Sequence, residues 1–303
     1  MKYLEKLPNE LEIKDKILDF LNFVAEKGKE KITSDRVSEL LSKIAGTLPD
    51  WNFWNGYRIP QPILVIDEAN LFSQLGRASL LKSFLNWLVL NTKEERRFHA
   101  ILTSSDSFFI NWIESQLQIP HVTPYVVGDL SIEEAEDYFE KHVLPRYGMS
   151  HQFIHTEYLN NGKFDHVRRI TGTRMLIINM YVSEYKINGG KLEFFRQEDD
   201  KLRTGLYPFG FSGEPIDPLW DQNDLIKVMK KIVEAEDKGF VLERDLIEEI
   251  GIRKLHSLVY NNFLHRRQTN MFANDINAPN EVILTAMNQP SLRAMERLLK
   301  ILA

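Results

Sequence analysis

The residues best suited to chemistry are two adjacent carboxylates at the end of an apolar run. The segment "QPILVIDEANLF" (61–72) places Asp67 and Glu68 directly after four branched apolar residues, Ile63–Ile66. The run predicts a buried strand, and open α/β sheets bind ligands at the carboxyl ends of their strands. An aspartate there can reach Mg²⁺ through water, and the following glutamate can polarise an attacking water. The alternative is an ordinary strand that ends in solvated acids.

A second polar strand end lies about 37 positions after Asp67, in the segment "AILTSSD" (100–106). It carries Thr103, Ser104 and Ser105 where the next apolar run ends. If the two strands are neighbours, these hydroxyls lie beside Glu68, where they can sense a phosphate or hold the attacking water. The other interpretation is the start of a helix, with Ser105 or Asp106 as the N-cap. The two interpretations are compatible.

Alternating strands and helices are needed to bring these two ends together. The first strand is apolar throughout, which predicts burial on both faces, as in a parallel sheet covered by helices. Strand–helix–strand–helix–strand order is typical of such a parallel α/β sheet. The expected elements are helices over 10–27 and 35–45, an aromatic loop over 49–62, a helix over 77–90, a buried strand over 97–106, a helix over 107–117 and a third strand over 121–130.

The remainder of the chain predicts helices first and a small α+β region afterwards. Ser131 and Glu134 have the spacing of a capping box at the start of a helix. A helix pair with a glycine turn follows over 164–186, and a segment rich in glycine and proline follows that pair. We therefore predict an α/β protein with four parts: a core over 1–127, a helical region over 128–203, a linker over 204–223 and a last domain over 224–303.

The last 80 residues have the pattern of a winged helix. Three helices are expected over 224–236, 243–251 and 252–267. A β-hairpin is expected over 270–290, with its tip at 274–280, before a closing helix. Three helices followed by a hairpin describe a relative of the helix-turn-helix group.

Composition excludes several classes of protein and site. The 303 residues carry a net charge of −5, which argues against general attraction to nucleic acid or anionic membranes. There is no cysteine, so disulfides and thiolate–metal sites are excluded. No segment approaches the roughly 20 apolar residues of a membrane span, and the N-terminus lacks the apolar core of a signal peptide. We expect an intracellular protein, most simply cytoplasmic, with mitochondrial and nuclear locations left open.

The order of these motifs resembles the archaeal-type ATPases, P-loop NTPases near the AAA+ and STAND groups. The resemblance covers about residues 60–303, and the order and spacing of the motifs carry it. The segments that match are "ILVIDEANLF" as the Walker B strand, "HAILTSSD" as the sensor-1 strand, "VVGDLSIEEAEDYFEKHVLP" as the entry to a helical lid, "VRRITGTRMLIINMYV" as the lid helices, and the C-terminal winged helix.

The resemblance implies roles for particular residues. Asp67 corresponds to the aspartate associated with Mg²⁺, which it holds through water, and Glu68 to the catalytic glutamate. Ser104 or Ser105 corresponds to the sensor-1 position. Arg174 stands in "ITGTR" (170–174), where the family usually has proline, and an arginine there could itself contact phosphate.

The phosphate-binding loop of such proteins, G-x-x-x-x-G-K-[ST], is not found in this sequence. The three Gly-Lys pairs, at Gly28, Gly162 and Gly190, lack the flanking residues of that loop. The resemblance implies Mg-ATP as the cofactor, and without the loop we expect its binding to be weak or absent. Two explanations stay open, a truncated chain and a degenerate relative, and ATP hydrolysis stays open with them.

Two functions follow from this sequence. The first is an ATPase-derived nucleotide-binding protein with a regulatory winged helix. The second is a non-enzymatic adaptor that uses the lid and the winged helix to bind a protein partner or another copy of itself. Nucleic acid is the less favoured partner because residues 224–303 carry 12 Lys+Arg against 11 Asp+Glu, although Arg253, Lys254, Arg266 and Arg267 offer a basic group.

Overall fold

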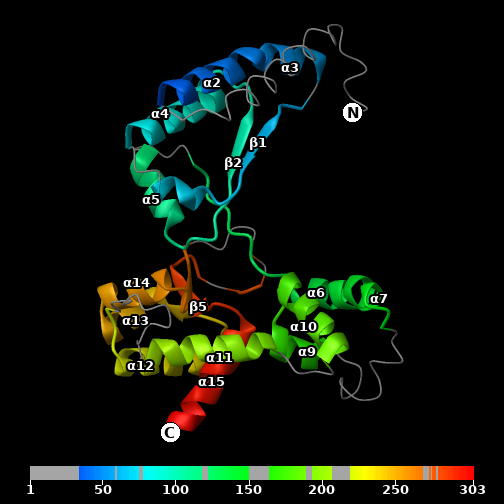
Figure 1. The fold of residues 1–303 in the computed structure, drawn as a ribbon, viewed down its shortest axis with the longest axis vertical. Helices are drawn as coiled ribbons and strands as arrows, with labels where there is room; N and C mark the ends of the chain where they lie inside the picture. The colour runs from blue at the N-terminus through cyan, green and yellow to red at the C-terminus, as the bar shows by residue number, and fades with distance from the viewer. Residues whose placement is uncertain are drawn as a thin grey trace. The chain divides into compact units, whose positions relative to one another are not determined.

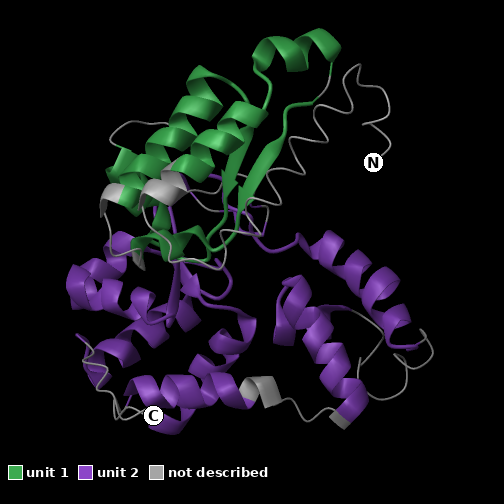
Figure 2. Cartoon of the chain, turned by 45° about the horizontal axis from the view of Figure 1, so that its top comes forward, with its two compact units in different colours: residues 1–123 green, residues 124–303 purple. Residues whose placement is uncertain are grey.

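The computed structural model is a mixed α/β protein that is mostly helical. It describes residues 34–58, 60–74, 78–117, 122–149, 164–188, 193–206, 219–268, 273, 275–277 and 279–303. The helix expected over 10–27 lies outside these residues. The chain divides into two compact units, residues 1–123 (unit 1) and residues 124–303 (unit 2), which Figure 2 shows in green and purple.

Unit 1 contains a small parallel sheet. Strands β1 (Ile63–Ile66) and β2 (His99–Leu102) pair in parallel, with Ile66 opposite Leu102. The helices of unit 1 are α2 (Ser34–Thr47), α3 (Trp51–Tyr57), the 3-10 helix η2 (Ala69–Gln74), α4 (Ala78–Val89), its π-helical continuation η3 (Leu90–Glu94), and α5 (Phe109–Leu117). The order of strands and helices from β1 to α5 confirms the predicted strand–helix–strand–helix arrangement (Figure 1).

The core of unit 1 lies against one face of this sheet. Leu64, Ile66, Ala100 and Leu102 pack on a buried cluster to which α4 and α5 contribute most of the side chains. The members of that cluster are Ala69, Leu81, Leu85, Leu88, Phe98, Phe109 and Ile113. Ile63 and Val65 point to the other face and are each 58% exposed. The expected burial of both faces is therefore wrong for the described residues, because side chains alternate along a strand and the described helices cover one side only.

Two further elements differ from the sequence prediction. The expected third strand over 121–130 is not formed, since residues 122–130 lie in neither helix nor strand. Branched residues such as Val126 and Val127 favour extended backbone, but a strand also needs a hydrogen-bonded neighbour. The expected aromatic loop contains helix α3, which begins because the Asp50 carboxylate accepts a hydrogen bond from the Phe53 N–H at 3.1 Å.

Unit 2 begins with a helical bundle. Its helices are α6 (Ile132–Tyr138), the π-helix η4 (Phe139–Val143), the short α7 (Leu144–Arg146), α9 (Phe164–Thr171) and α10 (Met175–Asn188). The predicted capping box is confirmed, since Ser131 and Glu134 exchange hydrogen bonds at 2.9 and 3.2 Å. The predicted glycine turn is also confirmed: Gly172, between α9 and α10, has a φ of +68°.

A long helix joins this bundle to the last part of unit 2. Helix α11 (Glu193–Leu206) packs against α12 (Gln222–Glu234) and α15 (Gln289–Leu302). Residues 204–206 of the expected linker are therefore helical, and residues 222–223 already belong to α12. Residues 207–218 of that segment lie outside the described residues.

The last part of unit 2 holds the helices α12 to α15 and a three-stranded antiparallel sheet. Its elements between α12 and α15 are β3 (Val241–Leu242), α13 (Glu243–Ile250), α14 (Ile252–Tyr260), β4 (Leu264–Arg267) and β5 (Ile283–Ala286), and the strand order is β3-β5-β4. The hairpin begins earlier than predicted, because residues 264–267 form its first strand and do not extend the third helix. Asn262, with a φ of +59°, follows the end of α14, and such a conformation stops a helix.

Candidate functional site

The parallel register brings the acidic end of β1 beside the hydroxyl end of β2. The Asp67 Oδ1 atom accepts a hydrogen bond from the Thr103 hydroxyl and another, at 3.0 Å, from the Glu68 N–H. Backbone hydrogen bonds hold the two ends together, from the Thr103 N–H to the Ile66 carbonyl and from the Ala69 N–H to the Thr103 carbonyl, both at 2.9 Å. The carboxylate and the hydroxyl are thus fixed at one edge of the sheet.

The electrostatics of this edge favour an ionised aspartate. The hydrogen bond from Thr103 lowers the pKa of Asp67, and the backbone N–H of Glu68 lowers it further. Asp67 is exposed, so its charge is available to a ligand. Because both donors contact the same oxygen, Oδ1, the other carboxylate oxygen can bind a metal-bound water.

Glu68 has an uncommon backbone conformation. Its φ of +52° lies in the left-handed region, which a residue with a side chain adopts at a cost of about 1–2 kcal/mol. Glu68 is exposed, and η2 starts at the next residue. Because of this turn, the backbone at Glu68 no longer follows the direction of strand β1. Backbone strain of this kind is frequent at functional sites.

Of the two predicted serines, Ser104 takes part in this edge. Its hydroxyl donates to the Asn70 side-chain oxygen at 3.1 Å and accepts from the Asp106 N–H at 3.0 Å. Ser105 is exposed. The alternative N-cap role is found for Asp106 and not for Ser105: the Asp106 carboxylate accepts from the Phe108 N–H at 2.8 Å and its carbonyl accepts from the Phe109 N–H at 3.1 Å, so Asp106 caps the turn that leads into α5.

The sequence singled out Thr103 as one of three hydroxyls at this strand end, but not its contact with Asp67, and it did not single out Asn70. The signal for Thr103 is the register: residues 36 apart pair along β1 and β2, so Asp67 stands opposite Thr103. Asn70 follows the acidic pair by two residues and reaches Ser104 because η2 turns the chain back over the strand ends. Neither relationship can be read before the pairing of the strands is known.

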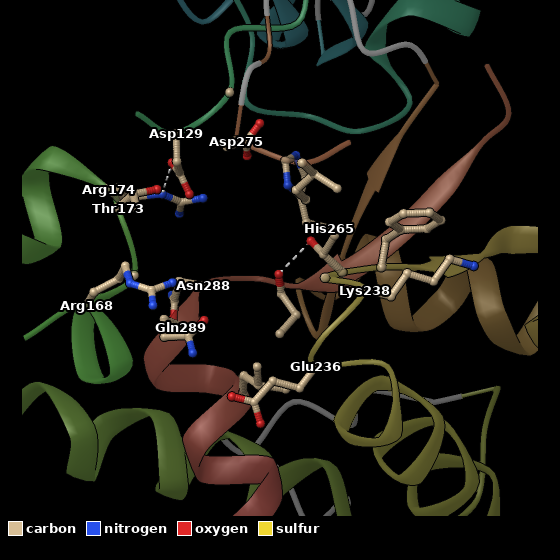
Figure 3. A pocket seen from close by; sticks show the side chains of 18 of the residues that line it. Asp129, Arg168, Thr173, Arg174, Glu236, Lys238, His265, Asp275, Asn288 and Gln289 are labelled. Carbon is tan, nitrogen blue, oxygen red and sulfur yellow. Dashed lines mark hydrogen bonds and ion pairs between the residues drawn. The ribbon is translucent and has the colours of Figure 1, made fainter. Parts of the chain in front are cut away.

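Arg174 belongs to unit 2, whereas the other predicted site residues belong to unit 1. Its Nε atom donates to the Asp129 Oδ1 at 2.8 Å (Figure 3). Gly172, two residues before it, makes the sharp turn that leads into α10. Arg174 is therefore held by a carboxylate of the segment before α6, and its two terminal amino groups lie outside that contact.

Arg174 lines a cavity of about 850 Å³ within unit 2. The α9–α10 turn, residues 235–240, strands β4 and β5, and the start of α15 form its walls (Figure 3). His265 on β4 also faces this cavity. Burial, together with the charges of Arg267 and Arg174, lowers the pKa of His265 to about 4, so its imidazole is neutral at physiological pH.

The basic residues considered for nucleic-acid contact are mostly engaged within unit 2. Arg266 donates to both carboxylate oxygens of Glu243, at 2.6 and 3.1 Å, and the Arg266 side chain is only 8% exposed. Arg267 donates to both oxygens of Asp275, at 2.9 and 3.0 Å. Lys254 pairs with Asp224 at 2.7 Å. Each of these cations is therefore largely neutralised by a partner.

The described parts of the chain hold neither a ready-made metal cluster nor a membrane-spanning helix. There, no group of three or more His, Asp or Glu side chains could enclose a metal ion. Mg²⁺ commonly uses only one or two protein carboxylates, with waters and phosphates as its other ligands, so Asp67 fits that mode of binding. Nor does any helix in these parts combine the length and apolar character that crossing a membrane requires.

Comparison with known proteins gives one distant similarity. The chain is 25% identical over 147 residues to the uncharacterized ATP-binding protein MJ1659 of Methanocaldococcus jannaschii. The match covers 47% of this chain and 39% of that relative, so the chain spans well under half of the relative's length. No family model matches the chain. No solved structure matches it either.

Proposed function

We propose that this chain is a nucleotide-binding protein of the P-loop NTPase lineage, close to the AAA+ and STAND groups. The observation that carries the proposal is the edge at which Asp67 and Thr103 meet, at the carboxyl ends of two parallel strands. Ligands of open α/β sheets bind at that edge. The distant similarity to a protein described as ATP-binding supports the same assignment.

Each residue of the edge has a role in this proposal. Asp67, whose pKa the Thr103 hydroxyl lowers, would hold Mg²⁺, and the metal would supply charge neutralisation for the phosphates. Glu68 orients the attacking water. Ser104, fixed by Asn70, contacts the γ-phosphate, with Ser105 as the alternative for that contact. In unit 2, the two terminal amino groups of Arg174 can contact phosphate while Nε stays on Asp129.

The rest of the proposed architecture follows the same lineage. Residues 128–203 correspond to its helical lid, and the three helices with the antiparallel sheet at the C-terminus correspond to its winged helix. Because the sequence has no phosphate-binding loop, we expect weak nucleotide affinity and slow or no hydrolysis.

A calorimetric titration with Mg·ATP tests the proposal. We expect Mg²⁺-dependent binding with a dissociation constant of about 1 mM, which is weak because the loop that supplies most phosphate contacts is missing. Asp67→Asn should remove the dependence on Mg²⁺. Glu68→Gln should keep binding and lose any hydrolysis. Glu94→Gln, an exposed acid outside this edge, serves as the control. Absence of any heat of binding at millimolar Mg·ATP would overturn the proposal.

A second candidate function is a protein-interaction adaptor. Helix α14 exposes two large apolar side chains, Ile252 at 50% and Tyr260 at 78%. Exposed aromatic residues are enriched where proteins bind one another. This surface, together with the missing phosphate-binding loop, favours a protein partner or a second copy over nucleic acid. It becomes the leading function if Mg·ATP does not bind.

A further inference from the structure

The turn that follows β1 is fastened to the end of β2 at two places. Asp67 accepts a hydrogen bond from the Thr103 hydroxyl. Further along the turn, the Asn70 side-chain oxygen accepts one from the Ser104 hydroxyl at 3.1 Å. Glu68 lies between these two contacts and has a φ of +52°. The residue proposed to orient the attacking water is therefore part of a strained turn that is held on both sides.

The hydroxyl proton of Ser104 is already in use. A serine hydroxyl has one proton to donate and can accept two hydrogen bonds. The proton goes to the Asn70 side-chain oxygen, and the hydroxyl oxygen accepts from the Asp106 N–H at 3.0 Å. An ionised phosphate oxygen only accepts hydrogen bonds. Ser104 can therefore contact a phosphate only after its proton has left Asn70.

Asn70 and a phosphate thus compete for the same proton. A hydrogen bond to a charged acceptor is about twice as strong as one to a neutral acceptor. A γ-phosphate that reaches Ser104 should therefore take the proton from the neutral amide of Asn70. A nucleoside diphosphate lacks this third phosphate group, so it should leave the bond between Ser104 and Asn70 in place.

Loss of this bond changes the turn locally. Asn70 belongs to η2, and its carbonyl accepts from the Ser73 hydroxyl at 2.7 Å. The Glu68 carbonyl accepts from the Leu71 N–H at 3.0 Å, so Glu68 is connected to the same short helix. The Ala69 N–H stays bonded to the Thr103 carbonyl and keeps η2 at the strand end. The expected change is therefore confined to the side chain of Asn70 and the turn at Glu68.

From these contacts we propose that Asn70 is a positioning residue that makes the site respond to a triphosphate and not to a diphosphate. Without nucleotide, Asn70 holds the Ser104 hydroxyl. A γ-phosphate takes over this hydroxyl and releases Asn70, which loosens one of the two contacts that hold the turn at Glu68. The inference rests on the proposed nucleotide function and adds to it how the third phosphate is recognised.

The side-chain amide signals of Asn70, observed by NMR in the full chain, test the first part of the inference. Asn70→Ala removes these signals and so assigns them. Without nucleotide, Ser104→Ala should shift them, because the amide oxygen loses its donor. Ser115→Ala, which removes an exposed hydroxyl of α5, should leave them in place. Unshifted signals in Ser104→Ala would overturn the inference.

Nucleotide addition tests the exchange itself. Mg·ATP should shift the Asn70 amide signals of the wild type toward their position in nucleotide-free Ser104→Ala. Mg·ADP at the same concentration should leave them where they are. In Ser104→Ala, Mg·ATP should cause no further shift of this kind. An equal response to both nucleotides would overturn the inference, because the bond would then not depend on the third phosphate.

Affinities give an independent measure of the competition. Asn70→Ala should bind Mg·ATP about 3- to 10-fold more tightly, since Ser104 then has no competing acceptor. Ser104→Ala should bind it about 3- to 10-fold more weakly, and Ser104→Thr, which keeps the hydroxyl, should restore the affinity. Neither alanine variant should change the affinity for Mg·ADP. A purely structural role of Asn70 would instead weaken the binding of both nucleotides. Asn52→Ala, at an exposed position of α3, is the matched control.

The outcomes separate this inference from the proposed function. If Mg·ATP does not bind the wild type, the proposed function fails and the inference fails with it. If Mg·ATP binds but Asn70→Ala binds it no more tightly than Asn52→Ala does, only the inference fails. It also fails alone if Ser105→Ala loses affinity for Mg·ATP and Ser104→Ala does not, because Ser105 would then make the contact.

Discussion

At the scale of single residues, one hydrogen bond connects the two polar strand ends. The Thr103 hydroxyl donates to Asp67, and this contact is the first cause of the lowered pKa of that carboxyl group. A threonine beside an aspartate thus lowers the pKa of the residue best placed to hold a metal. Ser104 acts on Asn70 instead, which makes it a natural control.

We predict that Thr103→Val raises the pKa of Asp67 toward its ordinary value, whereas Ser104→Ala leaves it unchanged. A carboxyl pH titration by NMR measures both. Since folding lowers this pKa, the hydrogen bond stabilises the folded chain at neutral pH, and that contribution disappears as the pH falls through the lowered value. An unchanged pKa in Thr103→Val would show that the backbone N–H of Glu68 is sufficient.

His265 gives a second pH dependence with the same sign. Its pKa is about 4 in the folded chain against an ordinary value of 6.5, because burial disfavours the charged imidazole. The neutral form therefore supports stability fully above pH 6.5, and this support is lost as the pH falls from 6.5 to 4. At pH 5 the loss should reach about 2 kcal/mol.

Urea unfolding at pH 7 and pH 5 measures this loss. His265→Gln should lose about 2 kcal/mol less than the wild type between the two pH values. His142→Gln, which removes an exposed histidine, should behave as the wild type does. Equal losses in all three proteins would contradict the assignment of a neutral His265.

At the scale of elements, the α9–α10 turn depends on a glycine for two reasons. Gly172 has a φ of +68°, and an added Cβ would lie 3.0 Å from the Cβ of Gln289 at the start of α15. Gly148 has almost the same φ, +65°, with nothing within 4 Å of an added Cβ. Comparing Gly148 with Gly172 separates the free-energy cost of the positive φ from the cost of the contact with Gln289.

We predict that Gly148→Ala costs about 1 kcal/mol of unfolding free energy and that Gly172→Ala costs clearly more. The difference between the two costs is the free energy needed to displace α15 from the turn. Thermal or chemical unfolding of the two variants measures it. Equal costs would mean that the turn and α15 separate without penalty.

The elements also show which patterns can be read locally. Ile63–Ile66, the capping box at Ser131 and the turn at Gly172 were predicted because neighbouring residues decide them. Strand β4 was read as helix, since "LHRR" has no strong strand pattern of its own. Its buried arginines pair with Glu243 and Asp275, and neither carboxylate belongs to this strand. The strand is therefore fixed by pairing with β5 and by these ion pairs.

At the scale of the whole molecule, each compact unit has its own core. In unit 1 the core covers one face of the β1–β2 sheet, and Ile63, Val65 and Ile101 are exposed on the other. In the helical bundle of unit 2 a separate cluster forms around residues such as Phe139 and Ile178. The effect of a substitution on stability should therefore depend on the face of the sheet that the side chain occupies and not on whether the side chain is apolar.

We predict that Val65→Thr changes the stability by no more than about 0.5 kcal/mol, because Val65 is 58% exposed. Leu85→Ala, at a side chain 2% exposed, should cost about 2–5 kcal/mol. Chemical unfolding measures the two. A large cost for Val65→Thr would mean that another surface covers this face in solution.

The sequence by itself determined the strands β1 and β2, most helices, the helix starts and the acidic pair, because periodicity, capping residues and glycine act over a few neighbours. The tertiary structure alone decided that Thr103 meets Asp67, that the described helices cover one face of the sheet only, that residues 122–130 join no strand, and that Arg174, His265 and Gln289 line one cavity. Those features depend on register and packing between distant segments. The free energy of such a contact depends on two residues that are distant in the sequence, so a local sequence pattern cannot predict it.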